Sequence, residues 1–441
     1  MAEPSPPGPL SHPHTRTPGR GGGDSGSLFS VSGSGLKDIR GGRDCKDGSE
    51  KDGNEAGRHA PPSPGGPGVR PGEGSGVRVL DLLVIGGGPS GLATAIRARL
   101  AGLDVAVLER FHPPIDKACG EGLMPDAVAR LREIGVDPGG FPFRGIRYVD
   151  GDLVAEGIFP HAGGLGVRRV QLHEALIRRA EETGVELLWG VCALGLEADG
   201  VLTDQGKIPA RWIAGADGLL SRVRKWAGLE GGPGPLRRFG VRRHYAIPPW
   251  TDLVEVHWGP SCEAYVTPVG PDEIGVALLW SDGKSDFDDL LERLPALQGR
   301  LADAPVGSRD RGAGPLHQRV LAVYRGNVAL IGDASGYLDA ITGEGMAVAL
   351  HHSAAFVDAL VAGDLSLYAA AHRRIARLPD FMTSLVLGME RRPALRRRAL
   401  RALAAEPALF SRLLGIHGRT LPPRRLGIDG ALKLAWRLVA A

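Results

Sequence analysis

The 441-residue sequence is poor in the features that mark several large classes of protein. It has four cysteines and no C-x-x-C pair, so we expect no metal site, no disulfide framework and a reducing compartment. Its 53 Lys and Arg nearly balance its 50 Asp and Glu, which argues against a nucleic-acid partner. It lacks an apolar run of about 18 residues and an N-terminal segment of the signal-peptide kind. These absences predict a cytoplasmic protein.

Residues 1–77 differ in composition from the rest of the chain. They are dominated by Gly, Pro, Ser and charged residues, which bury too little apolar surface to offset the entropy lost on ordering, so we predict a disordered tail. The alternative is a gene-start artefact, with translation beginning at a non-Met codon near Val69 or Val77, because the next methionine after Met1 is Met124. Peptides from residues 1–60 in the native protein would exclude the artefact.

From residue 78 onward, the patterns are those of an α/β protein with an insertion. The apolar runs that predict short buried strands are 79–85, 105–108, 185–189, 212–214 and 328–331. Helical patterns at 171–183 and from about residue 343 alternate with them, as in a parallel sheet. Four further strand candidates follow one another without helices, at 239–245, 254–258, 263–269 and 274–280. They predict an inserted antiparallel sheet.

The predicted fold class is therefore α/β, a Rossmann-type three-layer cofactor domain with an inserted, mainly antiparallel β-sheet and C-terminal helices. The cofactor domain comprises residues 78–235 and 322–378, and the substrate-binding sheet occupies residues 236–321. Residues 379–441 are rich in Ala, Leu and Arg, and prolines at 393, 407 and 422–423 predict several short helices there.

The strongest motif follows the first predicted strand directly. It is the G-x-G-x-x-G sequence Gly86-Gly87-Gly88-Pro89-Ser90-Gly91, placed before a helical run. In such a motif Gly86 allows the tight turn, Gly88 lets a pyrophosphate approach the backbone, and Gly91 lets helix and strand pack closely. Glu109, at the end of the second strand, is placed to accept hydrogen bonds from a ribose. The pattern predicts a dinucleotide but leaves FAD and NAD undecided.

Two later segments carry a resemblance to a known superfamily. One is Gly215-Ala216-Asp217-Gly218, followed by Ser221 and Arg224, and the other is Gly332-Asp333 after an apolar strand. Together with the glycine turn they resemble the FAD-dependent aromatic hydroxylase and geranylgeranyl reductase superfamily, over roughly residues 79–375. The resemblance implies bound FAD, with Asp217 and Asp333 among its contacts, and NADH or NADPH as a transient electron donor.

The resemblance also implies further cofactor contacts. Asp333 would contact the ribityl chain or ribose. Gly343, Gly345 and Met346 would open a helix whose positive dipole end faces the isoalloxazine. Arg169 stands where this superfamily carries an arginine for the phosphates or ribityl chain, although its neighbour Arg168 could take that place, or both could only solvate the helix start. Arg110, beside Glu109, is a further predicted contact.

Two residues are candidates for a catalytic role. Cys119, in the segment Lys117-Ala118-Cys119-Gly120, resembles the Cys-Gly loop of the geranylgeranyl reductase branch, and a nearby lysine could lower its pKa. An inert apolar cysteine is the alternative. Tyr265 lies on the inserted sheet, where the superfamily presents substrate to the flavin, or else is a core aromatic. Prenyl reductases usually show Tyr-x-Trp-x-Phe-Pro in this region, and here no tryptophan is present.

The C-terminal arginines define one further hypothesis. The run Arg391-Arg392 to Arg396-Arg397-Arg398 and Arg401 is interleaved with leucines, which makes a basic amphipathic helix. Such a helix could contact an anionic membrane surface peripherally and suit a lipophilic substrate. Alternatively, its leucines pack on the helix's own domain and its arginines are only solvated.

Together the motifs predict an FAD-dependent oxidoreductase. The first hypothesis is a monooxygenase that uses NADH or NADPH and O₂ to hydroxylate a small lipophilic or aromatic substrate of polyketide or isoprenoid origin. The alternatives are a reductase that saturates prenyl-type double bonds and a non-catalytic flavin-binding accessory protein. The Cys-Gly loop supports the reductase, and the missing tryptophan weakens it.

Overall fold

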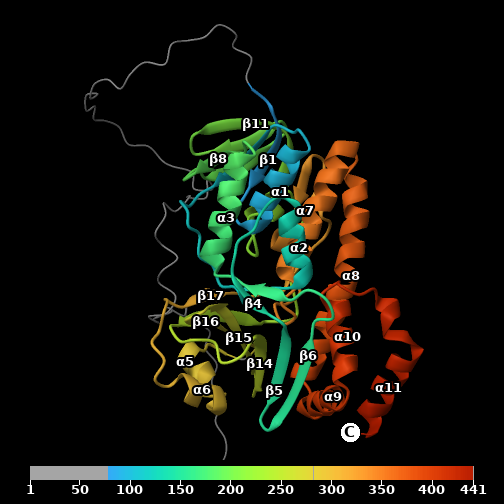
Figure 1. Ribbon diagram of the computed structural model, residues 1–441. Coiled ribbons are helices and arrows are strands. Elements are labelled where there is room, and N and C mark those ends of the chain that lie inside the picture. The colour runs from blue at the N-terminus through green and yellow to red at the C-terminus, as the bar shows by residue number, and fades with distance from the viewer. Residues whose placement is uncertain (1–77, 282, 441) are drawn as a thin grey trace, which may run out of the picture.

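The computed structural model describes residues 78–281 and 283–440, and the predicted disordered tail lies outside them. Two sheets organise these residues, one above the other in Figure 1, and helices flank both. The upper sheet carries the cofactor motifs, whereas the lower sheet contains the predicted insertion.

The upper sheet has the strand order β19-β20-β11-β1-β2-β8. Its strands are β1 (Leu80–Ile85), β2 (Val105–Glu109), β8 (Glu186–Trp189), β11 (Gly206–Gly215), β19 (Tyr324–Arg325) and β20 (Val328–Leu330). All neighbours pair in parallel except β19, which is antiparallel to β20. Because β20 pairs with β11 after the insertion, the sheet is completed late in the chain, which confirms the predicted Rossmann-type fold.

Alternate residues of β1 face two separate cores. Leu82 and Val84 pack beneath helices, whereas Leu83 and Ile85 pack on the opposite side. The helical layer contains α1 (Pro89–Leu100), α2 (Pro125–Glu133), α3 (Arg169–Glu182) and α7 (Gly345–Ala362). The opposite layer contains β9 (Ala193–Glu197), β10 (Gly200–Thr203) and α4 (Arg222–Trp226). The three-layer arrangement is thus present.

Helix α7 is central to the helical layer. In the part of the chain that the structure describes, it is the one helix long and apolar enough to cross a membrane by length and composition. It packs against α1 and α8 (Leu365–Glu390), and its Leu350 and Phe356 are fully buried. Its apolar composition is therefore accounted for by packing inside the domain.

The lower sheet has the order β17-β13-β16-β15-β14-β5-β6. Its strands are β5 (Gly145–Asp150), β6 (Leu153–Ile158), β13 (Phe239–Tyr245), β14 (Leu253–Gly259), β15 (Cys262–Gly270), β16 (Glu273–Trp280) and β17 (Arg311–Ala313). All pairs are antiparallel except β14 with β5. The helices α5 (Phe287–Leu291) and α6 (Pro295–Leu301) pack with its outer face.

The hairpin β5–β6 departs from the predicted domain boundaries, which assign residues 78–235 entirely to the cofactor domain. Leu253 of β14 pairs with Gly145 of β5, so this hairpin extends the substrate sheet. The hairpin lacks a clear apolar alternation in the sequence because it carries charged residues. In the structure these are neutralised across the sheet, where Arg147 forms ion pairs with Glu156 and Glu255. The inserted sheet therefore takes strands from two separate parts of the chain.

Short strands and the C-terminal helices complete the fold. The sheet β3-β7-β4 consists of β3 (Gly122–Leu123), β4 (Phe141–Phe143) and β7 (Gly164–Gly166), and β12 (Glu230–Pro233) pairs with β18 (Gln318–Val320). After α8 follow α9 (Pro393–Ala405), α10 (Pro407–His417), η2 (Pro423–Leu426) and α11 (Gly427–Ala440). The predicted breaks at the prolines are confirmed. The boundary at residue 379 instead falls inside α8, which accommodates Pro379 and extends from the upper to the lower part of the molecule (Figure 1).

Candidate cofactor and substrate site

The turn after β1 leaves no room for side chains. Gly86 has φ +115°, and an added Cβ would lie 2.4 Å from the Ala216 carbonyl oxygen. An added Cβ on Gly91 would lie 1.9 Å from the Gly86 carbonyl oxygen, so α1 packs directly on the turn. Both positions therefore require glycine for the reason that the motif predicts.

Gly88 has open space in front of it. An added Cβ would have one neighbour, Arg169 Nη2 at 3.7 Å, and Gly88 lines a large cavity. Gly88 is also the N-cap of α1 and provides no side-chain cap. The first N–H groups of α1 and the positive end of its dipole are thus available to a phosphate. Ser90, in the first turn of α1, lines the same wall.

The cavity has a volume of about 2020 Å³ and extends from the glycine turn to the C-terminal helices. Because pockets for one ligand usually measure about 300–1,000 Å³, it has room for a dinucleotide and a second molecule. One end, which we call the cofactor end, contains the polar residues Arg110, Arg169, Asp217 and Asp333. The other, which we call the apolar end, is lined by Met382, Leu385, Met389, Leu403, Phe410, Leu413 and Leu414.

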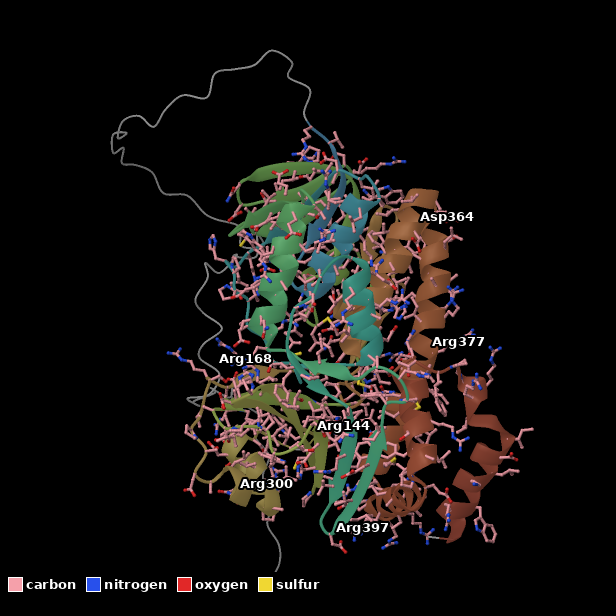
Figure 2. All side chains as sticks on the ribbon, in the orientation of Figure 1. Arg144, Arg168, Arg300, Asp364, Arg377 and Arg397 are labelled. Atoms are coloured by element: carbon pink, nitrogen blue, oxygen red, sulfur yellow. The ribbon has the colours of Figure 1, made fainter. Side chains whose placement is uncertain are left out.

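Arg169 lines the cofactor end, whereas the neighbouring arginine does not. Its backbone N–H donates to Glu121 Oε1 at 2.7 Å, and its buried side-chain Nε has no hydrogen-bond partner among the described residues. Arg168 instead forms an ion pair with Glu273, at the junction of the two parts of the molecule (Figure 2). The unpaired buried guanidinium nitrogen beside Gly88 fits a phosphate or another acceptor on the cofactor.

Asp333 lines the same end from η1 (Gly332–Ser335). No described residue donates a hydrogen bond to its carboxylate, and burial raises its pKa against the opposing effect of Arg169 and Lys117. A buried carboxylate without a protein donor suits the ribityl or ribose hydroxyls that the sequence predicts for it. Gly343, Gly345 and Met346 also line this wall, where α7 begins at Gly345.

Glu109 and Arg110 lie beside the turn but differ in access. The Glu109 carboxylate accepts hydrogen bonds from the Gly87 N–H at 2.9 Å and the Phe111 N–H at 3.1 Å, and it is not among the residues that line the cavity. It therefore holds the turn, and its contact with a ribose stays a prediction. Arg110 lines the cavity, with its guanidinium 4.5 Å from the Phe111 ring centre.

Asp217 has a structural role that the sequence did not reveal. Its carboxylate accepts hydrogen bonds from the Ser221 hydroxyl at 2.6 Å and from the Arg222 N–H at 2.7 Å, at the start of α4. The motif thus fixes the loop after β11, against which Gly86 packs. Asp217 also lines the cavity, so a direct cofactor contact remains a prediction.

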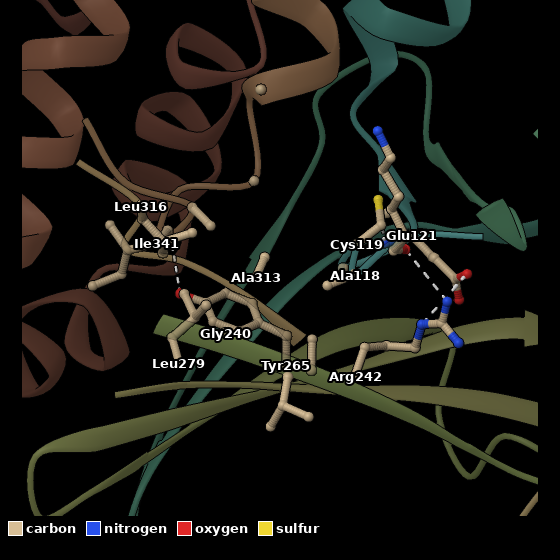
Figure 3. Close-up of a pocket in the computed structure, with 18 of the residues that line it drawn as sticks. Ala118, Cys119, Glu121, Gly240, Arg242, Tyr265, Leu279, Ala313, Leu316 and Ile341 are labelled. Carbon is tan, nitrogen blue, oxygen red and sulfur yellow. Dashed lines mark hydrogen bonds and ion pairs between the residues drawn. The ribbon is translucent and has the colours of Figure 1, made fainter. Parts of the chain in front are cut away.

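Cys119 lies on a loop that lines the cavity (Figure 3). The expectation of a lowered pKa is wrong. Burial raises the pKa of the thiol, and Arg169 opposes this only in part. Of the neighbouring charges, Arg169 and Arg242 lower the pKa of this thiol, whereas Glu121 raises it further. Cys119 is therefore a protonated thiol at neutral pH.

Tyr265, on β15, also lines the cavity, so it is not only a core aromatic. Its hydroxyl donates a hydrogen bond to the Ile341 carbonyl oxygen at 2.5 Å (Figure 3). This bond joins the substrate sheet to the segment that leads into α7. Tyr265 thereby connects the two parts of the site and positions the α7 N-terminus.

Sequence reasoning missed a buried polar network behind the Cys119 loop. Glu121 has φ +58°, and its carboxylate accepts a hydrogen bond from His244 Nε2 at 2.5 Å, while Arg242 forms an ion pair with Asp116. The network holds the loop on β13. The Cys-Gly segment indicated a functional loop, but no local pattern identified its partners, which lie more than a hundred residues further along the chain.

A second missed cluster lies behind Tyr265. Arg238 pairs with Glu263, with Asp339 at 2.9 Å and with Glu390 at 3.6 Å, and all four are buried. Burial, reinforced by Asp339 and Glu390, raises the pKa of Glu263 to about 8 despite Arg238. Asp339 also accepts the Ile341 N–H at 3.0 Å. The cluster therefore fixes the same segment that Tyr265 contacts.

Three features of the cofactor end fit FAD. The backbone at Gly88 is open, Arg169 Nε has no hydrogen-bond partner among the described residues, and no described residue donates a hydrogen bond to the Asp333 carboxylate. The fold and the site define a flavoprotein with a Rossmann-type FAD domain. Residues 81–129 match the family model of an FAD binding domain. A flavoprotein/dehydrogenase structure from Cytophaga hutchinsonii, 19% identical, matches with a TM-score of 0.71 over 82% of this chain and 98% of that chain, which shows the shared fold.

Curated relatives include both reductases and monooxygenases. The menaquinone reductase of Mycobacterium tuberculosis is 29% identical over 65% of this chain and 78% of its own length. Digeranylgeranylglycerophospholipid reductase 1 of Methanothermobacter thermautotrophicus is 26% identical over 61% and 74%. The 12-dehydrotetracycline 5-monooxygenase/anhydrotetracycline 6-monooxygenase of Streptomyces rimosus is 30% identical over 37% and 40%. The match to the FAD binding domain and these relatives support an FAD-dependent oxidoreductase that is similar to both FAD-dependent monooxygenases and geranylgeranyl reductase-like flavoproteins.

Proposed function

We propose that this protein is an FAD-dependent reductase that saturates a carbon–carbon double bond in a lipophilic, isoprenoid-type substrate. The carrying observation is the continuous cavity, whose cofactor end is polar and whose apolar end is built from leucine, methionine and phenylalanine side chains. An apolar chain buried there would gain roughly 0.8 kcal/mol per methylene. The two reductases named above match over about three quarters of their length, which supports the same reaction class.

The residues of the cofactor end have separate tasks in this proposal. The α1 N-terminus and Arg169 bind the phosphates, and Asp333 accepts hydrogen bonds from cofactor hydroxyls. The α7 N-terminus places N–H groups and a positive dipole end at the wall of the site. When bound, FAD supplies hydride transfer, and NADH or NADPH is the proposed electron donor.

Cys119 is the proposed proton donor. Adding a hydride to one carbon of a double bond requires a proton at the other, and a general acid must hold that proton before transfer. The raised pKa keeps the Cys119 thiol protonated beside the cavity. The Tyr265 hydroxyl already donates to the Ile341 carbonyl oxygen, so it is the less suitable donor.

The monooxygenase predicted from the sequence is the second candidate. It is favoured by the 30% identity to the Streptomyces rimosus enzyme, although the match covers 40% of that enzyme. Assays with prenylated quinones and polyprenyl lipids, using NADH and NADPH in turn, separate the two functions. The reductase predicts anaerobic products with two more hydrogens in the prenyl chain, measured after any quinol has been reoxidised to the quinone. Products that need air and contain one more oxygen atom would instead support the monooxygenase.

A further inference from the structure

The basic charge of the protein is concentrated at the C-terminal end. Residues 388–441 contain twelve Lys and Arg but three Asp and Glu, whereas the whole chain has a formal charge of +3. The remainder of the chain is therefore net acidic. These residues form the helices at the lower right of Figure 1.

Helix α9, the predicted membrane contact, is engaged with its own domain. Its Leu400 is fully buried, and Leu403 is nearly so. Arg396 Nε donates to Asp150 at 2.8 Å, and Arg397 Nη2 donates to Asp152 at 2.8 Å, beside the tip of the β5–β6 hairpin (Figure 2). The apolar face of α9 is thus covered, and a membrane contact must use another element.

Helix α11 has an uncovered apolar stripe. Ile428, Leu432 and Trp436 are 79%, 63% and 70% exposed, and their spacing of four residues places them on one helix face. Lys433 is also exposed beside this stripe, and the exposed Arg424 and Arg425 precede the helix in η2. An apolar stripe with a tryptophan and adjoining cations is typical of a helix that lies in a lipid interface.

The helix that carries the stripe packs on helices that line the apolar end of the cavity. α11 packs against α9, and Gly430 lies close to Leu409 of α10. On α8, Leu385 both lines the cavity and is 50% exposed. Phe381, one turn earlier, is 63% exposed.

We propose that η2 and α11 dock on an anionic lipid bilayer, from which the lipophilic substrate reaches the apolar end of the cavity. Charge complementarity selects this occupant, because anionic headgroups attract the cations beside the stripe. A symmetric contact with a second copy would instead place two basic C-terminal regions against each other. The substrate route rests on the proposed function, whereas the docking rests on the surface alone.

Vesicle co-sedimentation of the full-length, FAD-loaded protein tests the docking. We expect binding to vesicles of phosphatidylcholine with phosphatidylglycerol and at least about tenfold weaker binding to phosphatidylcholine alone. The variant I428S/L432S/W436S should lose on the order of tenfold or more in affinity for the anionic vesicles. The matched control V361S/L367S alters two exposed apolar residues on α7 and α8 and should bind like the native protein.

A second variant separates charge from apolar contact. R424Q/R425Q/K433Q should bind anionic vesicles about tenfold or more weakly and lose most of the salt dependence. Flavin absorbance and thermal unfolding establish that each variant is folded. Native protein that does not bind anionic vesicles, or a triple serine variant that binds as well as native, overturns the docking. The docking is also overturned if the native protein is a dimer that does not bind vesicles and if I428S/L432S/W436S converts that dimer to monomers.

Turnover distinguishes a failure of the docking from a failure of the proposed function. With substrate dispersed in detergent, I428S/L432S/W436S should keep native turnover, because the cavity is unchanged. With substrate in anionic vesicles, its turnover should fall in parallel with its binding. If the native protein shows no turnover in either detergent or vesicles, the proposed function is rejected, whereas the sedimentation result still decides the docking.

Discussion

The two ends of the cavity are built in different ways. At the cofactor end, most of the groups that would face the cofactor belong to the backbone. They are the turn at Gly86, the open Gly88 and the N-termini of α1 and α7. At the apolar end, the groups are side chains brought together from the substrate sheet and helices α8–α10. A backbone site tolerates few substitutions but accepts one kind of ligand, whereas a side-chain site can change its ligand by single replacements. Cofactor choice and substrate choice are thus separately determined.

Gly91→Ala should break the cofactor end with the largest effect. The new Cβ would lie 1.9 Å from the Gly86 carbonyl oxygen, so α1 must move away from the turn. We expect almost no FAD to co-purify, with destabilisation of about 3 kcal/mol or more. The FAD content per protein and the thermal midpoint measure this. Gly299→Ala, on α6 with no atom within 4 Å of the added Cβ, is the control and should retain both.

Cys119→Ala tests whether the thiol on the cavity loop donates the proton. If the thiol is the proton donor, kcat for reduction should fall about a hundredfold while the substrate KM and FAD content change little. Steady-state kinetics under anaerobic conditions measure kcat and the substrate KM separately. Cys262→Ala, a buried thiol on β15 outside the cavity lining, is the matched control. Unchanged kcat in Cys119→Ala would remove the thiol from the mechanism.

Arg169→Gln tests the main charged side chain of the cofactor end. Losing a charged hydrogen bond should cost about 1.5–3 kcal/mol, or roughly tenfold to a hundredfold in FAD affinity. Arg168→Gln is the natural control, because Arg168 pairs with Glu273 and does not line the cavity. Titration of the apoproteins with FAD compares the two. Equal losses would show that Arg169 has no specific role in binding FAD, and a larger loss in Arg168→Gln would assign the contact to Arg168.

Glu263→Gln tests how the buried carboxyl of the substrate sheet makes stability depend on pH. Burial raises the pKa of Glu263 to about 8, so the folded state retains a proton that the unfolded state releases at lower pH. This contribution to stability is present at low pH and is lost as pH rises through about 8. The native thermal midpoint should therefore fall between about pH 5 and pH 8 more steeply than that of the variant, with no further difference in slope above that range. Asp252→Asn, whose pKa is lowered by Arg144, should leave the native slope unchanged.

The cofactor end could be predicted well because its signals are local. The glycine motif lies within six consecutive residues, and the strand predicted at 79–85 agrees with β1 to within one residue. The substrate sheet was predicted less completely. The β5–β6 hairpin carries charged residues that satisfy one another across strands, so its pattern did not identify a partly buried sheet.

Environment-dependent properties could not be read from neighbours in sequence. The pKa of Cys119 depends on burial beneath the rest of the fold rather than on Lys117. The carboxylate of Asp217 is committed to the start of α4, and Arg238 gathers three carboxylates from distant segments. Each case depends on tertiary contacts that no motif encodes.

The central claim is that the protein reduces a lipophilic double bond. A single turnover tests it most directly: the FAD-loaded protein is reduced under argon, mixed with a prenylated quinone, and the product is analysed by mass spectrometry. Because reduction of the ring to a quinol also adds two hydrogens, the product is analysed after the ring is reoxidised. It should then retain two hydrogens added to the prenyl side chain, formed without oxygen and at a much lower rate in Cys119→Ala. Unchanged quinone side chains under argon, with an oxygenated product only after admission of air, would contradict it.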